Sequence, residues 1–441
     1  MKFNGGYNVM LEGAPSIGIA TYEKPDALHL PLFSDCLDFS LLQVEHGDSV
    51  KKGQVLAKDP VNYSVPLLAP MDGTINLEIA ERHITLENLS SSEESVLDEA
   101  DVDDDKRQIL LRLGVWSFMT RLDNGRIPDP ETVPESLIIP VFRFEPFLPN
   151  AELLLKESLD QFIEGLGKIH KTLDGAAIQL ILPETESALK APLHQAAEQS
   201  DWLTLHEVPE TYPFDHPALL AQMLELNPEK VWTIDIQAVL GAQGALDKNR
   251  PYVKRIISVS GPMAAQPTHH QVPLGYPISL LVGQASNTEL RIICGGVLTG
   301  KVIDSAQLGM DAECVALTIL EEMTEREVMA FAQAGFGKQS YSRTFASFFK
   351  PLFKEKFTTA LRGESRPCVF CGFCENVCPA GIIPHLIHRY LDNDRPEDAY
   401  RVGLDKCIEC GLCSYVCLSK INHLELLQAG KEQAATEAIE G

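Results

Sequence analysis

Eight cysteines near the C-terminal end of this 441-residue chain have the spacing of iron–sulfur ligands. They form two runs of the pattern C-x2-C-x2-C-x3-C, Cys368–Cys378 and Cys407–Cys417. Bacterial ferredoxins hold [4Fe–4S] cubes with this spacing, because three thiolates separated by two intervening residues can wrap one corner of a cube on a tight turn. Gly372 and Gly411 supply backbone freedom inside those turns. The chemistry expected of such a stretch is one-electron transfer.

The fourth cysteine of each run stands at the start of the next segment and usually reaches the other cluster. The predicted ligands are Cys368, Cys371, Cys374 and Cys417 for the first cube, and Cys407, Cys410, Cys413 and Cys378 for the second. A zinc site needs only four ligands, typically two C-x2-C pairs, and leaves the third cysteine of each run unexplained. A disulfide scaffold fits small secreted chains. An altered cluster type is the remaining alternative. Pro379 follows the first run, whereas Leu418 stands at the matching place in the second, and neither residue is a ligand.

Composition limits the classes of partner. The formal net charge is −25, and so acidic a surface argues against nucleic acid. No stretch approaches the roughly 20 apolar residues needed to span a bilayer, and the N-terminus does not begin a signal peptide. The other cysteines, Cys36, Cys294 and Cys314, are predicted to be core thiols. We therefore expect a reducing, cytoplasmic location and membrane attachment only through a partner.

The sequence pattern of the segments that must position the clusters predicts an α/β multidomain chain. The expected parts are an N-terminal barrel-sandwich hybrid with an acidic loop (1–115), a Rossmann-like α/β domain (116–262), a small β-grasp-like module (263–318) and an all-helical cluster domain (319–441). Residues 90–107 form the acidic loop, which composition predicts to be solvated.

Residues 40–89 contain short β-rich runs separated by Gly-Asp and Asp-Gly turns, which predict hairpins. The pattern resembles the biotinyl/lipoyl carrier domains. Those carriers need a lysine at the hairpin tip, where this chain has Asn62. A swinging-arm role is therefore not expected.

Strand-like and helical runs alternate between residues 135 and 260. The expected strands are Leu137–Phe142, Ala177–Leu182, Val231–Ile234 and Ile256–Val259, and the expected helices are Ala151–Lys171 and a helix capped at Asp215–Pro217 that runs to Leu226. No G-x-G-x-x-G follows the first strand, as a dinucleotide fold would require. The run Gly295–Lys301 matches G-x4-G-K, but Val302 replaces the hydroxyl that would hold Mg²⁺. A turn between strands is the better interpretation.

The C-terminal part is predicted to be helical around the clusters. The expected helices are Glu321–Gln333, Thr344–Phe353, Ile383–Leu391 and Pro396–Val402. His385 and His388 fall on the third of these. Because the eight cysteines already suffice for two cubes, these histidines are expected to pack or to support the ligands. No catalytic residue is predicted.

A family resemblance joins these parts. Six stretches look like NqrA of the sodium-translocating NADH:quinone reductase, namely Gly114–Trp116, Glu229–Ile234, Val259–Pro262, Pro273–Gly275, Gly295–Gly300 and Ser342–Phe345. The cluster end is similar to RnfC of the Rnf complex, at Cys407–Gly411 and Tyr415–Cys417. The resemblance covers nearly the whole chain. Known NqrA proteins lack the two clusters, and known RnfC proteins carry a glycine-rich cofactor loop that this chain does not show.

The resemblance implies an electron-transfer subunit of an Nqr/Rnf-like complex, an oxidoreductase only within that complex. It would lie on the inner face of the cell membrane, held by membrane-embedded and redox subunits. Quinone is implied by family analogy alone, and the missing glycine loop argues against FMN and NADH. Two alternatives are an NADH-oxidising flavin enzyme and a scaffold whose clusters only stabilise helices.

Overall fold

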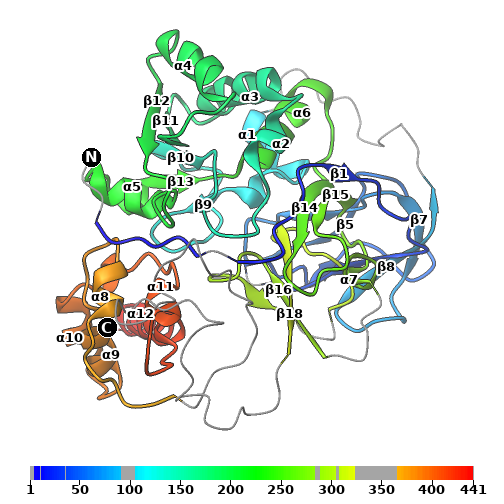
Figure 1. Ribbon diagram of the computed structural model, residues 1–441. Helices are drawn as coiled ribbons and strands as arrows, with labels where there is room; N and C mark the ends of the chain where they lie inside the picture. The colour runs from blue at the N-terminus through cyan, green and yellow to red at the C-terminus, as the bar shows by residue number, and fades with distance from the viewer. Residues whose placement is uncertain are drawn as a thin grey trace.

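The computed structural model describes residues 4–9, 11–34, 36–90, 105–283, 289–303, 307–322 and 365–440. Within them the chain forms several sheets, flanking helices and a helical C-terminal region, as the mixed α/β prediction requires (Figure 1). Most of the acidic loop and the two helices expected over 321–333 and 344–353 lie outside the described residues.

The N-terminal part contains two antiparallel sheets. The turn predicted at Gly47-Asp48 forms, whereas the turn predicted at Asp72-Gly73 is wrong, because both residues lie in a strand. One is β2 (Leu28–Pro31), β8 (His83–Ser90), β7 (Asp72–Asn76) and β4 (Ser49–Val50), and the other is β3 (Leu41–Leu42), β5 (Val55–Lys58) and β6 (Pro66–Leu68). Asn62 lies in the turn between β5 and β6, where its amide donates to the Cys36 carbonyl at 2.8 Å. The prediction that Cys36 is a core thiol is wrong, because Cys36 is exposed.

The α/β domain is built on a five-stranded sheet. Its order is β12 (Leu203–Val208), β11 (Ala177–Pro183), β10 (Ser136–Pro140), β13 (Val231–Thr233) and β9 (Thr120–Arg121), the first four strands parallel and β9 antiparallel. Its helices are α1 (Lys106–Arg112), α2 (Ala151–Leu155), α3 (Leu159–Thr172), α4 (Lys190–Glu198), α5 (Pro217–Met223) and α6 (Ile236–Lys248). The expected helix of 151–171 is divided into α2 and α3. The predicted cap of α5 is confirmed, since His216 accepts a hydrogen bond from the Ala218 N–H.

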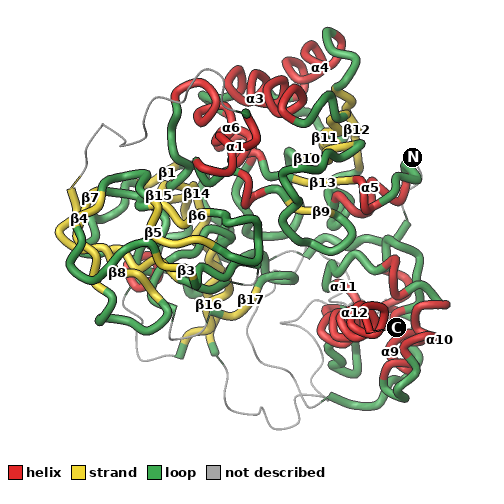
Figure 2. The backbone as a smooth tube through the Cα atoms, turned by 180° about the vertical axis from the view of Figure 1, so that it is seen from behind, coloured by secondary structure: helices red, strands yellow, loops and turns green. Residues whose placement is uncertain are grey.

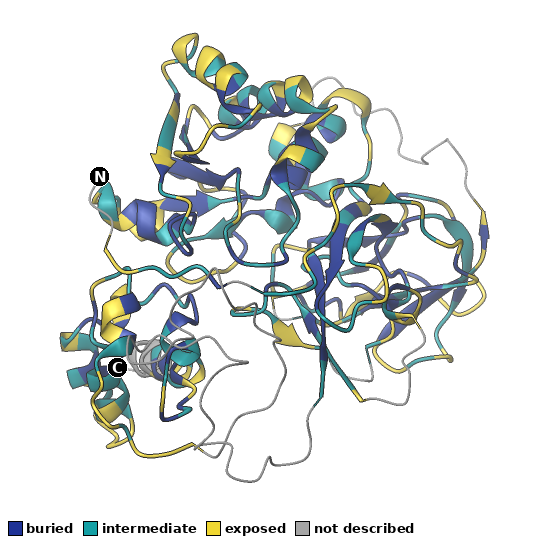
Figure 3. Cartoon of the chain, viewed as in Figure 1, coloured by how far each residue is buried: buried dark blue, intermediate teal, exposed yellow. Residues whose placement is uncertain are grey.

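The two faces of this sheet belong to different cores, because successive side chains of a strand point to opposite faces. Leu137 and Ile139 of β10 share one hydrophobic cluster with α3 and α6. Ile138 of the same strand faces α5 and the C-terminal helical region. Figure 3 shows buried residues along these strands. The sheet is thus the surface against which the cysteine-rich region packs.

A second, six-stranded sheet follows. Its order is β1 (Ile19–Ala20), β15 (Thr268–Pro273), β14 (Lys254–Ser260), β18 (Ala316–Glu321), β16 (Leu290–Cys294) and β17 (Lys301–Val302), with the short helix α7 (Ile278–Val282) beside it. The strand expected over 256–259 forms, but as β14 it joins this sheet and not the α/β sheet. The edge of β13 that it would have extended is already paired with β9. The strands of the predicted β-grasp-like module therefore share a sheet with β1 and β14.

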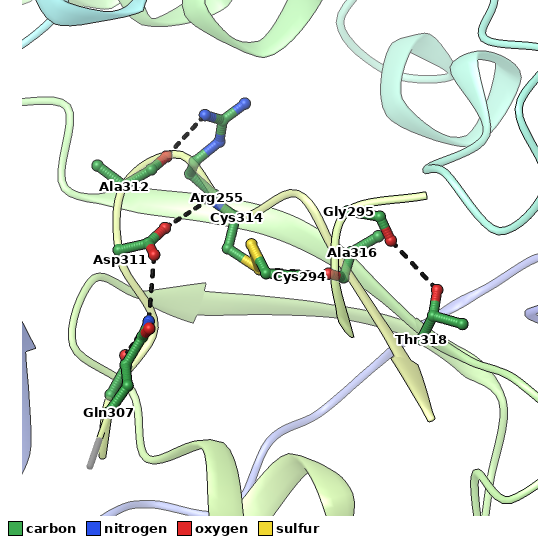
Figure 4. Close-up of a disulfide and its surroundings, with 10 residues drawn as sticks. Arg255, Cys294, Gly295, Gln307, Asp311, Ala312, Cys314, Ala316 and Thr318 are labelled. Carbon is green, nitrogen blue, oxygen red and sulfur yellow. Dashed lines mark hydrogen bonds between the residues drawn. A yellow bond between two sulfur atoms is a disulfide. The ribbon is translucent and has the colours of Figure 1, made fainter. Parts of the chain in front are cut away.

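Cys294 and Cys314 form a disulfide instead of the separate core thiols expected (Figure 4). Cys294 ends β16 opposite Leu317 of β18, and Cys314 lies just before β18, so sheet pairing brings the two residues to a Cα–Cα distance of 5.4 Å. The turn predicted over 295–300 is confirmed, since it joins the antiparallel strands β16 and β17.

The C-terminal region contains α8 (Phe373–Val377), α9 (Pro384–Leu391), α10 (Pro396–Arg401), α11 (Leu412–Tyr415) and α12 (His423–Glu440). It lies beside the α/β domain in both views of the backbone (Figures 1 and 2). The N-terminal segment links the two, because the Gly6 N–H donates to the Val377 carbonyl and the Tyr7 N–H to the Tyr212 carbonyl. None of the described helices combines the length and the hydropathy that a membrane span requires.

Candidate iron–sulfur centre

The two cysteine runs adopt the same local structure. Gly372 and Gly411, at matching positions, both have φ of 74°, a left-handed conformation that glycine adopts without strain. A short helix follows each glycine, α8 in the first run and α11 in the second. The glycines thus reverse the chain between the second and third cysteines of each run, as the spacing predicts.

Four cysteines from both runs line one pocket. They are Cys407, Cys410 and Cys413 of the second run and Cys378 of the first. The other walls are mainly apolar, with Ile382, Ile408, Leu412, Leu424 and Leu427 among them. This is the set of residues predicted for the second cube. Four thiol donors with apolar walls fit a [4Fe–4S] group, whose potential depends on burial and on hydrogen bonds to sulfur.

The remaining cysteines lie around the first run. Cys368 and Cys417 are brought together through their neighbours, since the Arg366 N–H donates to the Ser419 carbonyl at 2.8 Å and Ser419 Oγ donates to the Pro367 carbonyl at 3.0 Å. Cys371 is exposed and Cys374 is buried. Burial is the main cause that raises the pKa of the Cys374 thiol, and the nearby Cys371 and Cys417 raise it further. These positions support the predicted first ligand set, which stays a prediction.

Burial acts on the thiols before any metal is bound. It is the largest cause that raises the pKa of Cys374 and of Cys407 to about 11, and of Cys410 to about 12. A cluster binds thiolates, so iron must displace protons that these buried sites hold tightly.

Among the described residues, no three His, Cys, Asp or Glu side chains lie close enough together to hold a metal ion.

His385 lies beside the first cluster site. Its Nδ1 is 3.6 Å from Cys374 Sγ, and its ring meets that of Phe370 edge-on at 5.7 Å. His388 lies one turn further along α9, with its ring 5.4 Å from that of the buried His423. The expectation that His385 supports a ligand agrees with this contact.

The second run is fixed to the rest of the protein by contacts that the sequence did not reveal. Tyr212 Oη donates to the Cys410 carbonyl at 2.7 Å, and Gln222 Nε2 donates to the Lys406 carbonyl at 3.0 Å. From α12, Lys431 donates to the Cys407 carbonyl and pairs with Glu409 of the second run. Tyr212 and Gln222 are about 200 positions away in sequence, and no spacing rule connects them to the cysteines.

The turn between β16 and β17 also touches this run. The Leu298 carbonyl lies 2.6 Å from where a Cβ on Gly411 would stand. The turn is held by the buried Glu145, whose carboxylate accepts from the Leu298 N–H, the Thr299 N–H and the Thr299 hydroxyl. Burial raises the pKa of Glu145, and those hydrogen bonds oppose the rise. Gly411 is therefore required both for its backbone angle and for its lack of a side chain.

Comparisons with known proteins agree with this organisation. Residues 102–247 match the family model "NqrA second alpha/beta domain", and residues 367–421 match "4Fe-4S dicluster domain". Over 425 residues, or 90% of each chain, 27% of positions are identical to NqrA of the Na(+)-translocating NADH-quinone reductase of Glaesserella parasuis serovar 5. The chain is similar to NqrA over most of its length. The predicted resemblance to NqrA, with a dicluster [4Fe–4S] domain at the C-terminal end, is thereby confirmed.

The likeness to NqrA extends over nearly the full length. The Marinomonas sp. (strain MWYL1) protein is 27% identical over 451 aligned positions, which cover 97% of each chain. Among solved structures, an NAD+-reducing [NiFe]-hydrogenase in the H2-reduced state gives a TM-score of 0.44 with 14% identity, covering 76% of this chain and 67% of that one. A likeness of that size does not establish a common fold.

Proposed function

We propose that this chain is an electron-transfer subunit of an Nqr/Rnf-like redox complex at the membrane and passes electrons through two [4Fe–4S] clusters. The observation that carries the proposal is the pocket lined by Cys378 of one run and Cys407, Cys410 and Cys413 of the other. The dicluster match over 367–421 supports it. The likeness to NqrA suggests the setting, which includes membrane-embedded partner subunits, the cytoplasmic face and a link to quinone.

When bound, a [4Fe–4S] cluster supplies one-electron transfer with little change in shape. The protein's own residues hold, orient and shield the ligands. Ile382, Ile408 and Leu412 are almost completely buried beside the second set of cysteines and keep water from it. Tyr212 and Lys431 hold the backbone carbonyls of Cys410 and Cys407. The second ligand loop is thus fixed from the α/β domain on one side and from α12 on the other.

A direct comparison of reductants tests this function against its alternatives. The protein is loaded with iron and sulfide under anaerobic conditions and exposed to NADH, to dithionite, or to neither, while cluster absorbance is followed. We expect bleaching by dithionite alone and weak NADH binding by calorimetry, because the sequence contains no G-x-G-x-x-G motif that would bring backbone N–H groups to a phosphate.

Other results would identify the alternatives. Bleaching by NADH alone, with a flavin spectrum, would assign an NADH-oxidising enzyme. Loaded clusters that accept no electron at accessible potentials would assign a scaffold.

A further inference from the structure

One pair of cysteines outside the two runs is joined in the structure. Cys294 and Cys314 form the disulfide drawn in Figure 4, which connects the end of β16 to the segment before β18. Disulfides are rare in proteins of a reducing compartment, and those that occur there are usually transient and serve catalysis or redox sensing. A disulfide on a chain proposed to work at the cytoplasmic face therefore calls for a role besides cross-linking.

The two sulfurs differ in access. Cys294 is partly exposed, whereas Cys314 is 1% exposed. A thiolate attacks one sulfur of a disulfide and displaces the other, and access is one of the factors that decide which sulfur is attacked. Attack is therefore expected at Cys294, with Cys314 as the leaving group. Cys314 Sγ lies 3.2 Å from the Ala316 carbonyl oxygen, so the thiol that reduction releases already has a hydrogen-bond acceptor.

The segment that carries Cys314 is held by contacts other than the disulfide. The Cys314 N–H donates to Asp311 Oδ1 at 2.7 Å, and Arg255 Nη1 donates to the Ala312 carbonyl at 2.9 Å. Arg255 is buried and pairs with Asp235, which fixes its position. This side of the disulfide should therefore keep its place when the bond opens.

The segment that follows Cys294 leads to an exposed edge. Its turn begins directly after Cys294 and runs into β17, a two-residue edge strand of the described sheet in which both residues are exposed. Within this turn, the Leu298 carbonyl lies against Gly411 of the second cysteine run. The disulfide thus anchors the start of the turn that contacts the second ligand loop.

We propose that the Cys294–Cys314 disulfide is a thiol–disulfide exchange site for a dithiol protein, and that its reduction loosens the turn that contacts the second cysteine run. A thiolate of the dithiol attacks Cys294 Sγ, the bond between the cysteines breaks, and Cys314 leaves as a thiolate that takes up a proton. The second thiol of the partner then attacks the mixed disulfide and releases Cys294. The cysteine pair gains two electrons and two protons, and the partner becomes a disulfide. The reverse steps close the bond again.

The exchange chemistry is independent of the proposed function, and only its effect on the second cluster rests on that function. When the bond opens, the turn keeps its sheet pairing and its hydrogen bonds to Glu145 but loses its covalent anchor. Local opening of the turn should then become more frequent. The thiol poise of the cell would thereby set the stability of the second cluster and leave that of the first unchanged.

The first measurement follows exchange in the full-length, cluster-loaded protein under anaerobic conditions. The protein is equilibrated with mixtures of reduced and oxidised dithiothreitol, alkylated and digested without reductant, and the peptides joined by Cys294–Cys314 are quantified by mass spectrometry. We expect the bond to open and close reversibly while circular dichroism shows a folded protein throughout. Cys314→Ser, which leaves Cys294, should react with a small aromatic disulfide roughly tenfold faster than Cys294→Ser, which leaves Cys314. Peptide mapping assigns the thiol that reacted.

The second measurement compares the double variant Cys294→Ser/Cys314→Ser with Cys36→Ser, a control at an exposed cysteine. A serine hydroxyl in place of Cys314 can still donate to the Ala316 carbonyl. In the double variant, we expect amide hydrogen exchange over residues 295–300 to be roughly threefold faster, and the second cluster to be lost to an iron chelator roughly threefold faster. The first cluster should be lost at the unchanged rate.

Two results would overturn the exchange site, namely a bond that dithiothreitol opens only when the protein unfolds, and equal reactivity of the two single variants. Cysteines that stay reduced in oxidised dithiothreitol would overturn it as well. Equal hydrogen exchange over residues 295–300 in the double variant and in Cys36→Ser would overturn the effect on the turn. If the turn loosens while the clusters accept no electron from dithionite, the proposed function fails and the exchange site stands.

Discussion

Tyr212 Oη lies 2.7 Å from the carbonyl oxygen of Cys410 and joins the α/β domain to the ligand loop of the second cysteine run. The residues are 198 positions apart, and both are buried. This hydrogen bond and the Leu298–Gly411 contact fix the loop to the rest of the protein.

Tyr212→Phe should weaken the second cluster site and leave the first intact. The change removes the donor and leaves the buried Cys410 carbonyl without it, at a cost of roughly 1–3 kcal/mol. We expect about tenfold faster loss of the second cluster to an iron chelator, since about 1.4 kcal/mol is a factor of ten. The first cluster, followed by its own spectroscopic signal, should be lost at the unchanged rate. Tyr63→Phe, at a ring that is 43% exposed, is the control. Equal loss of both clusters would contradict the account.

Gly411→Ala and Gly372→Ala form a matched pair. Both glycines have φ of 74°, so alanine costs roughly 1–2 kcal/mol of backbone strain at either position. Only at Gly411 would the new methyl meet the Leu298 carbonyl, at 2.6 Å, which adds roughly 1–3 kcal/mol of overpacking. Iron content after reconstitution should therefore fall further in Gly411→Ala. Equal losses in the two variants would show that the Leu298 contact is unimportant.

Glu145 should make stability depend on pH. Burial raises its folded-state pKa, so the stability that it contributes is fully present below the ordinary glutamic acid pKa of 4.5 and is lost as pH rises through the folded-state value. Glu145→Gln keeps an acceptor for the Leu298 and Thr299 N–H groups and should flatten this part of the profile of thermal midpoint against pH. Glu145→Ala removes the acceptor of the Leu298 N–H, the Thr299 N–H and the Thr299 hydroxyl, and should lower stability by roughly 1–3 kcal/mol at every pH. Parallel profiles for the unchanged protein and Glu145→Gln would contradict this role.

Cys378→Ala tests the exchange of ligands between the runs. Because Cys378 lines the pocket of Cys407, Cys410 and Cys413, the variant should lose or alter the second cluster and retain the first. Electron paramagnetic resonance of the reduced protein distinguishes the two. Cys36→Ala, at an exposed cysteine of the N-terminal part, should change neither signal. Damage confined to the cluster of Cys371 and Cys374 would show that the pairing is wrong.

Local patterns predicted local structure well. The cysteine spacing indicated the turns at Gly372 and Gly411, and the Asp215–Pro217 sequence indicated the start of α5. Associations between distant segments left no such pattern. The apolar run Ile256–Val259 within β14 resembles those of the α/β sheet, yet β14 pairs with β15 and β18, and the β13 edge is paired with β9. Likewise, Cys294 and Cys314 meet because β16 pairs with β18, and Tyr212 reaches Cys410 because α5 packs on the cluster region.

The most direct test of the central claim is a coulometric reduction of the anaerobically purified protein, with iron, acid-labile sulfide and zinc measured on the same sample. Two cubes held by eight cysteines predict about eight iron and eight sulfide per chain and the uptake of about two electrons. Four iron per chain, zinc alone, or a full iron content that accepts no electrons would contradict the account.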